Sequence, residues 1–113
     1  MLKTVVKRSG EKVPFDASKI RGAIFKANVR IATEKFSEAE LDRLTDEVVE
    51  AAGKLRTTPT VEQIQDIVEE KLIESDYAKT AKAYILYRAE HQKLREMDDE
   101  LVKIYSALTF VSA

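Results

Sequence analysis

The sequence predicts a mostly helical α+β domain, in which a bundle of four or more helices is capped by a small N-terminal β-hairpin or three-stranded sheet. Three observations lead to this fold class. Apolar residues recur at helical spacing in four segments after residue 16. Two valine-containing runs flank a Ser-Gly pair near the N-terminus. The 113 residues suffice for one hydrophobic core but not for two.

The N-terminal hairpin is predicted from "TVVKR" and "EKVPF", which flank the two-residue turn "SG". In that register Val6 lies opposite Val13, and Lys7 lies opposite Lys12. Val6, Val13 and Phe15 then share the face that packs on the core. Two lysines directly opposite each other are unfavourable unless an anion lies nearby. The segment "RTTPT" before the third helix is a candidate third strand.

Four helical segments follow, and capping residues mark where each begins. The predicted caps are Asp16 or Ser18, then Ser37 with Glu40, then Thr60 with Gln63, and finally Ser75-Asp76. The predicted apolar stripes are Ile20, Ala23, Ile24, Ala27 and Ile31; Leu41, Leu44, Val48, Ala51, Ala52 and Leu55; Val61, Ile64, Ile67, Val68 and Leu72; and Ala81, Tyr84 and Ile85, with Arg88 on a related face.

A further amphipathic segment, "LREMDDELVKIYSALTF", lies near the C-terminus. Its apolar residues alternate at spacings of three and four: Leu94, Met97, Leu101, Ile104 and Leu108. Two interpretations remain open. The segment is either another core helix of this domain or a connector that packs on something outside this chain.

The composition favours a globular protein and excludes several classes of function. With 44% hydrophobic and 35% charged residues, the chain resembles a soluble domain rather than a disordered one. It has no apolar run long enough to span a membrane and no signal-peptide pattern. The absence of cysteine excludes disulfides, thiolate nucleophiles and cysteine zinc sites. We expect a cytoplasmic protein.

Few residues favour catalysis. The single histidine, His91, lies in the charged run "RAEHQK" and has no evident nucleophile or carboxylate partner. Carboxylates are numerous but lie in mixed-charge runs that are typical of solvated helix faces. The sequence contains neither a Walker A loop nor GxGxxG. We therefore expect a binding domain with no catalytic residue and no protein metal site.

The positive charge is concentrated in the N-terminal third. Residues 1–35 carry nine Lys/Arg and three Asp/Glu, whereas the other 78 residues carry ten and seventeen. This asymmetry indicates either an anionic partner or a basic face that balances acidic helices.

Lys19 makes the anionic partner more specific. It falls in the first turn of a helix, where a cation costs a few tenths of a kcal/mol because this end of the helix is already positive. A bound phosphate reverses that cost, and Lys7 and Arg8 of the hairpin can reach the same anion. The residues thus predict a polyphosphate site between the hairpin and the first helix. Nucleic acid is the rival ligand, but the hairpin lacks interleaved exposed aromatic residues for stacking bases.

"VVKRSGEKVPFDASKIRGAIFKA", "TVEQIQDIVEEKLIES" and "AKAYILYRAEHQKLRE" together resemble the ATP-cone, the regulatory nucleotide-binding domain of ribonucleotide reductases. The resemblance covers about residues 3–95. It implies a helical bundle with a β-hairpin or three-stranded cap that binds ATP or dATP, with Mg²⁺ carried by the triphosphate. It also implies control of an attached reductase, often through oligomeric state.

Residue by residue, the resemblance implies phosphate contacts from Lys7, Arg8 and Lys19, and a segment from Val13 to Lys19 that wraps the nucleotide. It also implies contacts from the start of the third helix and from the fourth helix. Some cones carry lysine where Glu90 stands. The full predicted set is Val6, Lys7, Arg8, Glu11, Lys12, Val13, Pro14, Phe15, Asp16, Lys19, Val61, Gln65, Tyr87 and Arg88.

The resemblance also implies partners and boundaries. Residues 1–95 form the cone, and residues 96–113 form a connector to a catalytic body outside this chain, most similar to that of an anaerobic ribonucleoside-triphosphate reductase. The partners are adenine nucleotides, that catalytic domain and, depending on nucleotide, a second copy; neither a membrane nor nucleic acid is expected. The alternative is the cone of a nucleotide-sensing transcriptional regulator, or a nucleic-acid-binding helical domain.

Overall fold

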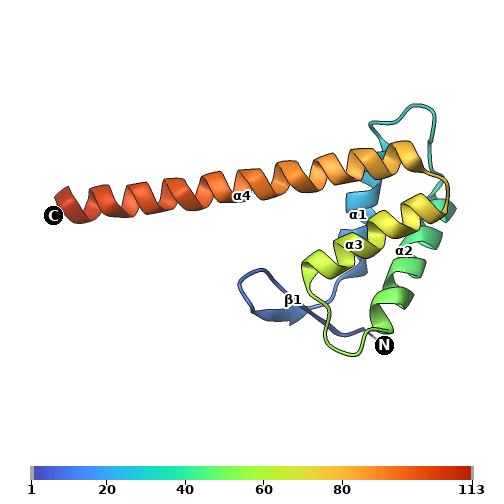
Figure 1. Cartoon of the computed structure of the whole chain (residues 1–113), viewed down its shortest axis with the longest axis horizontal. Helices are drawn as coiled ribbons and strands as arrows, with labels where there is room; N and C mark the ends of the chain where they lie inside the picture. Colours follow the sequence, from blue (N-terminus) through green and yellow to red (C-terminus); the bar gives the residue numbers. More distant parts are fainter. Residues whose placement is uncertain (1, 113) are drawn as a thin grey trace.

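A computed structural model describes the backbone of residues 2–112 and the side chains of residues 2–104. The elements in chain order are β1 (Thr4–Val6), β2 (Lys12–Pro14), α1 (Ala17–Asn28), α2 (Glu38–Gly53), α3 (Val61–Glu74) and α4 (Ala78–Ser112) (Figure 1). The two strands pair antiparallel, and the four helices form the rest of the fold. The predicted mostly helical α+β class is confirmed.

The core lies between the four helices and follows the predicted stripes. The largest fully buried apolar side chains are Ile24 of α1, Leu44 and Val48 of α2, and Val68 and Leu72 of α3. Two stripe predictions are wrong because of local geometry. Leu55 lies beyond the end of α2 and is exposed, and Ile85 of α4 faces solvent.

The predicted caps of α2 and α3 differ in how completely they form. At α3 the Thr60 hydroxyl accepts from the Gln63 N–H at 3.1 Å, and the Gln63 side chain accepts from the Thr60 N–H at 2.9 Å. This capping box is confirmed. At α2 Ser37 accepts from the Glu40 N–H at 3.1 Å, but the Glu40 carboxylate bonds Tyr77 instead of returning to Ser37. Only half of the second box therefore forms.

The prediction that Ser75-Asp76 caps α4 is wrong. Ser75 ends α3, and Asp76 takes a left-handed conformation with φ of 63°. The carboxylate of Glu34, from the loop before α2, supplies the cap: it accepts from the Thr80 N–H at 2.9 Å, the Thr80 hydroxyl at 2.8 Å and the Lys79 N–H at 3.3 Å.

The hairpin turn has three residues instead of the predicted two. The Lys7 N–H donates to the Glu11 carbonyl at 2.8 Å, and the Gly10 N–H donates to the Lys7 carbonyl at 2.8 Å. Gly10 has a φ of 88°, a left-handed conformation that glycine adopts without a steric penalty. The loop therefore comprises residues 8–10.

This extra turn residue shifts the register by one and corrects our pairing. Val5 lies opposite Val13, and Val6 lies opposite Lys12. A one-residue shift exchanges the two faces of a strand. Val5, which is 8% exposed, therefore faces the core in place of Val6, and Lys7 no longer opposes Lys12.

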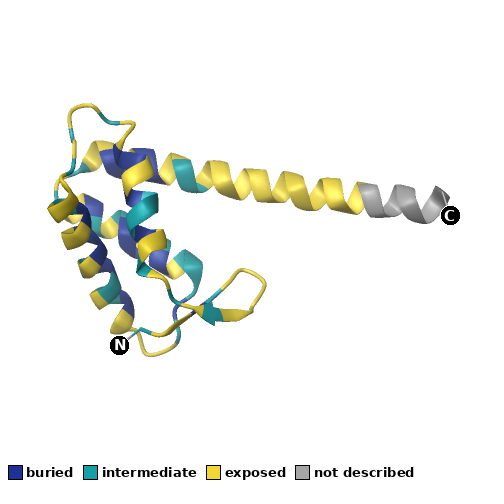
Figure 2. Cartoon of the chain, turned by 180° about the vertical axis from the view of Figure 1, so that it is seen from behind, coloured by how far each residue is buried: buried dark blue, intermediate teal, exposed yellow. Residues whose placement is uncertain are grey.

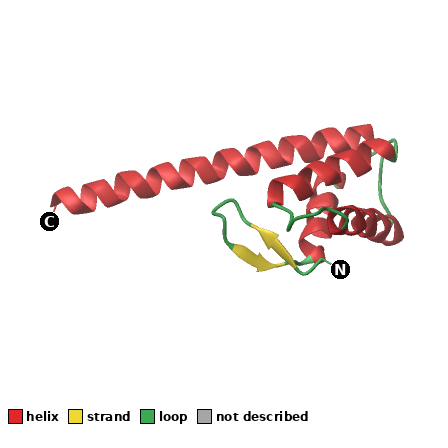
Figure 3. Ribbon diagram, turned by 60° about the horizontal axis from the view of Figure 1, so that its bottom comes forward, coloured by secondary structure: helices red, strands yellow, loops and turns green. Residues whose placement is uncertain are grey.

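The predicted third strand is reduced to a single bridge. The Val6 N–H donates to the Pro59 carbonyl at 2.9 Å, and Val6 pairs in parallel with Thr60. This bridge attaches the hairpin to the start of α3, while β2 leads directly into α1. Figure 3 shows the hairpin at the edge of the helical bundle.

The C-terminal amphipathic segment belongs to α4, a single helix of 35 residues that projects from the bundle. Residues 89–104 of this helix are exposed (Figure 2). Leu94, Met97, Leu101 and Ile104 are 50% to 61% exposed, so the interpretation as a core helix of this domain is wrong; Leu108 lies outside the side chains described. Within residues 2–112, none of the helices combines the length and apolar character that crossing a membrane requires.

Candidate functional site

A cavity of about 560 Å³ lies where the hairpin, the starts of α1 and α3, and α4 meet. This volume falls in the range typical of small-molecule sites. The lining residues are Val5, Lys7, Val13, Pro14, Phe15, Asp16, Lys19, Ile20, Ala23, Val61, Ile64, Gln65, Val68 and Tyr84.

The lining combines two cations with an apolar wall. Lys7, which follows β1, and Lys19 of α1 bring positive charge, and Asp16 is the only carboxylate among the lining residues. Most of the remaining wall is aliphatic or aromatic and includes Phe15 and Tyr84. A cavity of this kind fits a ligand with one anionic end and one flat or apolar end.

The corrected register explains how Lys7 reaches the cavity. Side chains alternate along a strand, so Lys7 lies on the same face as the buried Val5. Arg8 belongs to the three-residue turn and is not among the residues that line the cavity. The hairpin thus directs one of its two adjacent cations inward.

The start of α1 carries positive charge next to the cavity. Asp16 is the N-cap: its carboxylate accepts from the Ser18 hydroxyl at 2.6 Å and from the Ser18 N–H at 3.0 Å. These hydrogen bonds to Ser18 hold the pKa of the Asp16 carboxyl below its ordinary value. The first turn of α1 contains no acidic residue and includes Lys19.

The start of α3 forms the facing wall. Its Thr60–Gln63 capping box fixes the first turn, from which Val61, Ile64 and Gln65 face the cavity. Two helix N-termini, each with partial positive charge, therefore border the same space. This arrangement favours anions.

The structure brings together eight of the fourteen predicted site residues: Lys7, Val13, Pro14, Phe15, Asp16, Lys19, Val61 and Gln65. The other hairpin residues, Val6, Arg8, Glu11 and Lys12, do not line the cavity. Nor do Tyr87 and Arg88 on α4.

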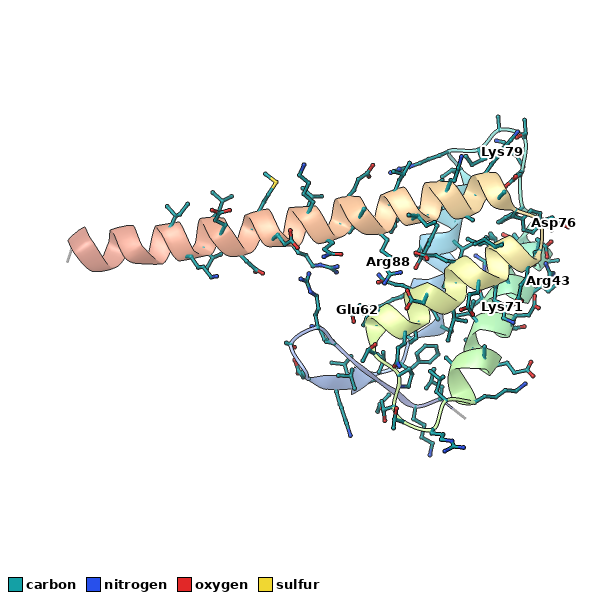
Figure 4. The ribbon with its side chains drawn as sticks, in the orientation of Figure 1. Arg43, Glu62, Lys71, Asp76, Lys79 and Arg88 are labelled. Atoms are coloured by element: carbon teal, nitrogen blue, oxygen red, sulfur yellow. The ribbon has the colours of Figure 1, made fainter. Side chains whose placement is uncertain are left out.

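Arg88 is engaged by carboxylates of α3. Its guanidinium donates to Asp66 at 2.8 Å and to Glu69 at 2.9 Å, and lies 3.5 Å from the Glu62 carbonyl (Figure 4). Burial lowers the pKa of Arg88, but the bonds to Asp66 and Glu69 outweigh it and hold the pKa above its ordinary value. In this structure Arg88 joins α4 to α3.

The neighbouring aromatic residues of α4 have different roles. Tyr87 packs against His91, with ring centroids 4.2 Å apart, and does not reach the cavity. Tyr84, one turn earlier, is 3% exposed and lines it. Burial raises the pKa of the Tyr84 hydroxyl above its ordinary value.

Six lining residues were not predicted as site residues: Val5, Ile20, Ala23, Ile64, Val68 and Tyr84. The helical spacing had assigned five of them to the core, which is correct for their packing. The hairpin register had placed Val5 on the outer face. Only the correct turn length would have identified it.

Within residues 2–104, His, Asp and Glu side chains form no group of three that could hold a metal ion. Asp16, which lines the cavity, caps α1, and Asp66 and Glu69 bond Arg88 outside the cavity lining.

Comparison with known proteins identifies the family. The model of the ATP cone domain matches residues 3–93. The vitamin B12-dependent ribonucleoside-diphosphate reductase of Thermoplasma acidophilum is 43% identical over 101 residues, covering 85% of this chain and 13% of the relative. The chain belongs to the ATP-cone family, as its motifs had indicated.

Two further relatives carry different names. The ribonucleoside-diphosphate reductase subunit alpha of Chlamydia muridarum is 35% identical, covering 88% of this chain and 11% of its own length. The anaerobic ribonucleoside-triphosphate reductase of Salmonella typhimurium is 34% identical, and the match covers 81% of this chain and 12% of the relative. This chain thus spans about an eighth of the length of these curated relatives.

Proposed function

We propose that this chain is a cytoplasmic, nucleotide-sensing regulatory domain whose cavity binds ATP and dATP. One observation carries the proposal: Lys7 of the hairpin and Lys19 of α1 both line the cavity, and apolar side chains line most of the rest of it. The two lysines suit a triphosphate, and the wall suits a nucleobase. Membership of the ATP-cone family supports the same ligand class.

The proposed pose follows from the charges. The triphosphate lies at the start of α1, where Lys19, Lys7 and the helix N-terminus act together. The base lies against the apolar wall near Phe15 and Tyr84. Gln65 contributes an amide that can bond the ribose or a phosphate. Mg²⁺ arrives with the triphosphate.

Of the fourteen predicted residues, we propose the eight that line the cavity as direct contacts. Arg8 is a proposed outer contact, because it follows Lys7 in the hairpin turn. Arg88 contributes only if it leaves Asp66 and Glu69, which nucleotide binding must then offset.

The regulated activity is that of a ribonucleotide reductase. We propose that residues 1–95 form the sensor and that residues 96–113 connect it to a catalytic body, with nucleotide changing the oligomeric state. The names of the relatives support the reductase. They span three kinds of reductase, and the anaerobic kind is our proposal from the sequence of the connector.

Titration calorimetry with ATP, dATP and a short DNA duplex, in the presence of Mg²⁺, tests the ligand class. We expect micromolar binding of both nucleotides and none of DNA. Absence of nucleotide binding would reject the proposal, and binding of DNA alone would favour the nucleic-acid alternative.

Matched lysine variants test the site. Lys7→Ala and Lys19→Ala should each weaken nucleotide binding about tenfold or more, because each removes a charge-assisted phosphate contact. Lys12→Ala is the control, since this lysine lies on the same hairpin but does not line the cavity. An effect of Lys12→Ala equal to that of Lys7→Ala would contradict the proposed orientation.

A further inference from the structure

One face of α4 is apolar, apart from Glu90, from the bundle to the end of its described side chains. The residues on this face follow one another at spacings of three and four: Ala83, Leu86, Glu90, Leu94, Met97, Leu101 and Ile104. Leu86 and Leu101 are 60% and 61% exposed. An apolar stripe of this size, interrupted by Glu90, on an exposed helix indicates a docking partner.

A second cavity of about 350 Å³ lies at the bundle end of this stripe. It is lined by Arg30 and Ile31, which follow α1, and by Lys79, Lys82, Ala83 and Leu86 of α4. The Lys79 ammonium donates to the Thr33 hydroxyl at 3.1 Å (Figure 4 labels Lys79). The groove therefore has an apolar floor and three cations at its rim.

The other end of the stripe has acidic residues beside it. Asp98, Asp99 and Glu100 follow one another between Met97 and Leu101, and all five residues are exposed. At 3.6 residues per turn, Asp98 and Glu100 lie on either side of the stripe, whereas Asp99 lies on the opposite face of the helix. Two carboxylates thus flank the apolar side chains of the distal arm, which matches the basic, apolar groove at the base of the same helix. A protein whose surface carries both halves of a complementary contact can pair with itself.

We propose that the α4 helices of two copies pair antiparallel, so that the acidic arm of each copy docks in the basic groove of the other. The pairing has two-fold symmetry, and each contact occurs twice. It requires no nucleotide and is independent of the proposed ligand.

The spacing defines a register. With Leu86 opposite Met97 of the second copy, the two-fold axis lies between positions 91 and 92. Glu90 then faces Lys93, and Lys82 lies beside Glu100. Glu90, the charged residue within the stripe, already lies 3.5 Å from Arg30 in its own copy. The arrangement therefore leaves no isolated charge at the centre.

A parallel pairing fits less well. It would place the two basic grooves at one end and the two acidic arms at the other, where like charges repel. The antiparallel pairing separates the two folded bundles and brings opposite charges together.

Light scattering coupled to size exclusion tests the pairing at about 100 µM protein. We expect a dimer that Met97→Glu converts to a monomer, with an unchanged far-UV circular dichroism spectrum. Lys103→Glu, which makes a charge change on α4 away from the stripe, should leave the dimer intact. A monomeric parent chain, or a dimer insensitive to Met97→Glu, would overturn the proposal.

Charge exchange tests the register. Lys82→Glu and Glu100→Lys should each weaken the dimer about tenfold, and the double variant should recover most of the parental affinity because the attraction is restored in reverse. Failure of the double variant to recover would exclude this pairing.

Cross-linking tests the direction. The chain has no cysteine, so Leu86→Cys and Met97→Cys chains can be mixed and oxidised without interference. Antiparallel pairing predicts the mixed cross-link, whereas a Met97→Cys homodimer in preference to it would indicate parallel pairing. Nucleotide binding by the Met97→Glu variant should be unchanged, which separates failure of this proposal from failure of the nucleotide site.

Discussion

The N–H groups at the start of a helix need hydrogen-bond acceptors, and the starts of α1 and α4 meet this need in different ways. At α4 the Glu34 carboxylate accepts from the Lys79 and Thr80 N–H groups, so the chain supplies its own anion to the positive end of the helix. At α1 the side chain of the cap, Asp16, accepts hydrogen bonds from Ser18, and the first turn carries Lys19 and no acidic residue.

This difference separates a structural helix start from one suited to a ligand. Glu34 lies in a hydrogen-bonded network that holds the loop before α2 against α4. The start of α1 borders a cavity that a second lysine, Lys7, also lines. The excess positive charge at α1 disfavours the free domain slightly and favours an anionic ligand.

The largest expected effect on stability is at Asn28, whose side chain hydrogen-bonds to both residues of the α4 cap, Glu34 and Thr80. Asn28 is 6% exposed; its amide donates to the Glu34 carbonyl and to the Thr80 hydroxyl at 3.1 Å, and its carbonyl accepts from the Phe36 N–H at 2.9 Å. Asn28→Ala should lower the free energy of unfolding by about 2 kcal/mol, because buried partners lose their hydrogen bonds.

Urea unfolding followed by circular dichroism measures this change. The exposed Gln92→Ala serves as control and should stay within about 0.5 kcal/mol of the parent. A loss at Asn28 no larger than at Gln92 would show that the network does not stabilise the α4 start.

Glu34→Gln should have a smaller, pH-dependent effect of about 1 kcal/mol at pH 7, because the amide remains an acceptor but loses its charge. Burial raises the pKa of Glu34, but hydrogen bonds from Thr80 and Lys79 outweigh it, so the pKa lies below its ordinary value in the folded state. The stabilisation is therefore present above the ordinary carboxyl pKa and is lost as the pH falls through the folded-state pKa.

Unfolding midpoints of the parent and Glu34→Gln, measured between pH 7 and pH 3, test this sign. The two curves should converge at acid pH. A gap between them that widens on acidification would mean that protonated Glu34 is the stabilising form.

Lys19→Ala should have the smallest effect on stability and the opposite sign. Removing a cation from the first turn of α1 should leave the free energy of unfolding unchanged or raise it by a few tenths of a kcal/mol. Thermal unfolding of the free domain measures this, with Lys26→Ala in the last turn of the same helix as the matched control. A loss above about 1 kcal/mol would assign Lys19 a structural role.

Local patterns predicted much of the fold. The Thr60–Gln63 box depends on residues three apart, and the helical stripes depend on spacings of three and four. The Glu34 cap was not predicted, because Glu34 and Thr80 are 46 residues apart in sequence and meet only through tertiary packing. The hairpin register was wrong because the turn contains Arg8 as well as Ser9 and Gly10, which a Ser-Gly pair alone does not reveal.

The candidate site, like the fold, could be predicted from the sequence only in part. Lys19 was conspicuous because its charge conflicts with its position in the helix, and Lys7 because like charges would have faced each other in the assumed register. The apolar wall could not be recognised from the sequence, because Ile64 and Val68 have the same spacing whether they line a cavity or fill a core. The position of Arg88 depends on Asp66 and Glu69, whose approach from α3 is set by helix packing.

The length of α4 has a mechanical consequence. Tyr84 lines the cavity, and about 40 Å of continuous helix separates it from Ser112 at 1.5 Å per residue. A tilt of about 5° at the cavity moves the far end of such a rigid rod by roughly 4 Å. If the helix behaves as a rigid rod, a sub-ångström adjustment around Tyr84 would displace its far end by about the diameter of a methyl group.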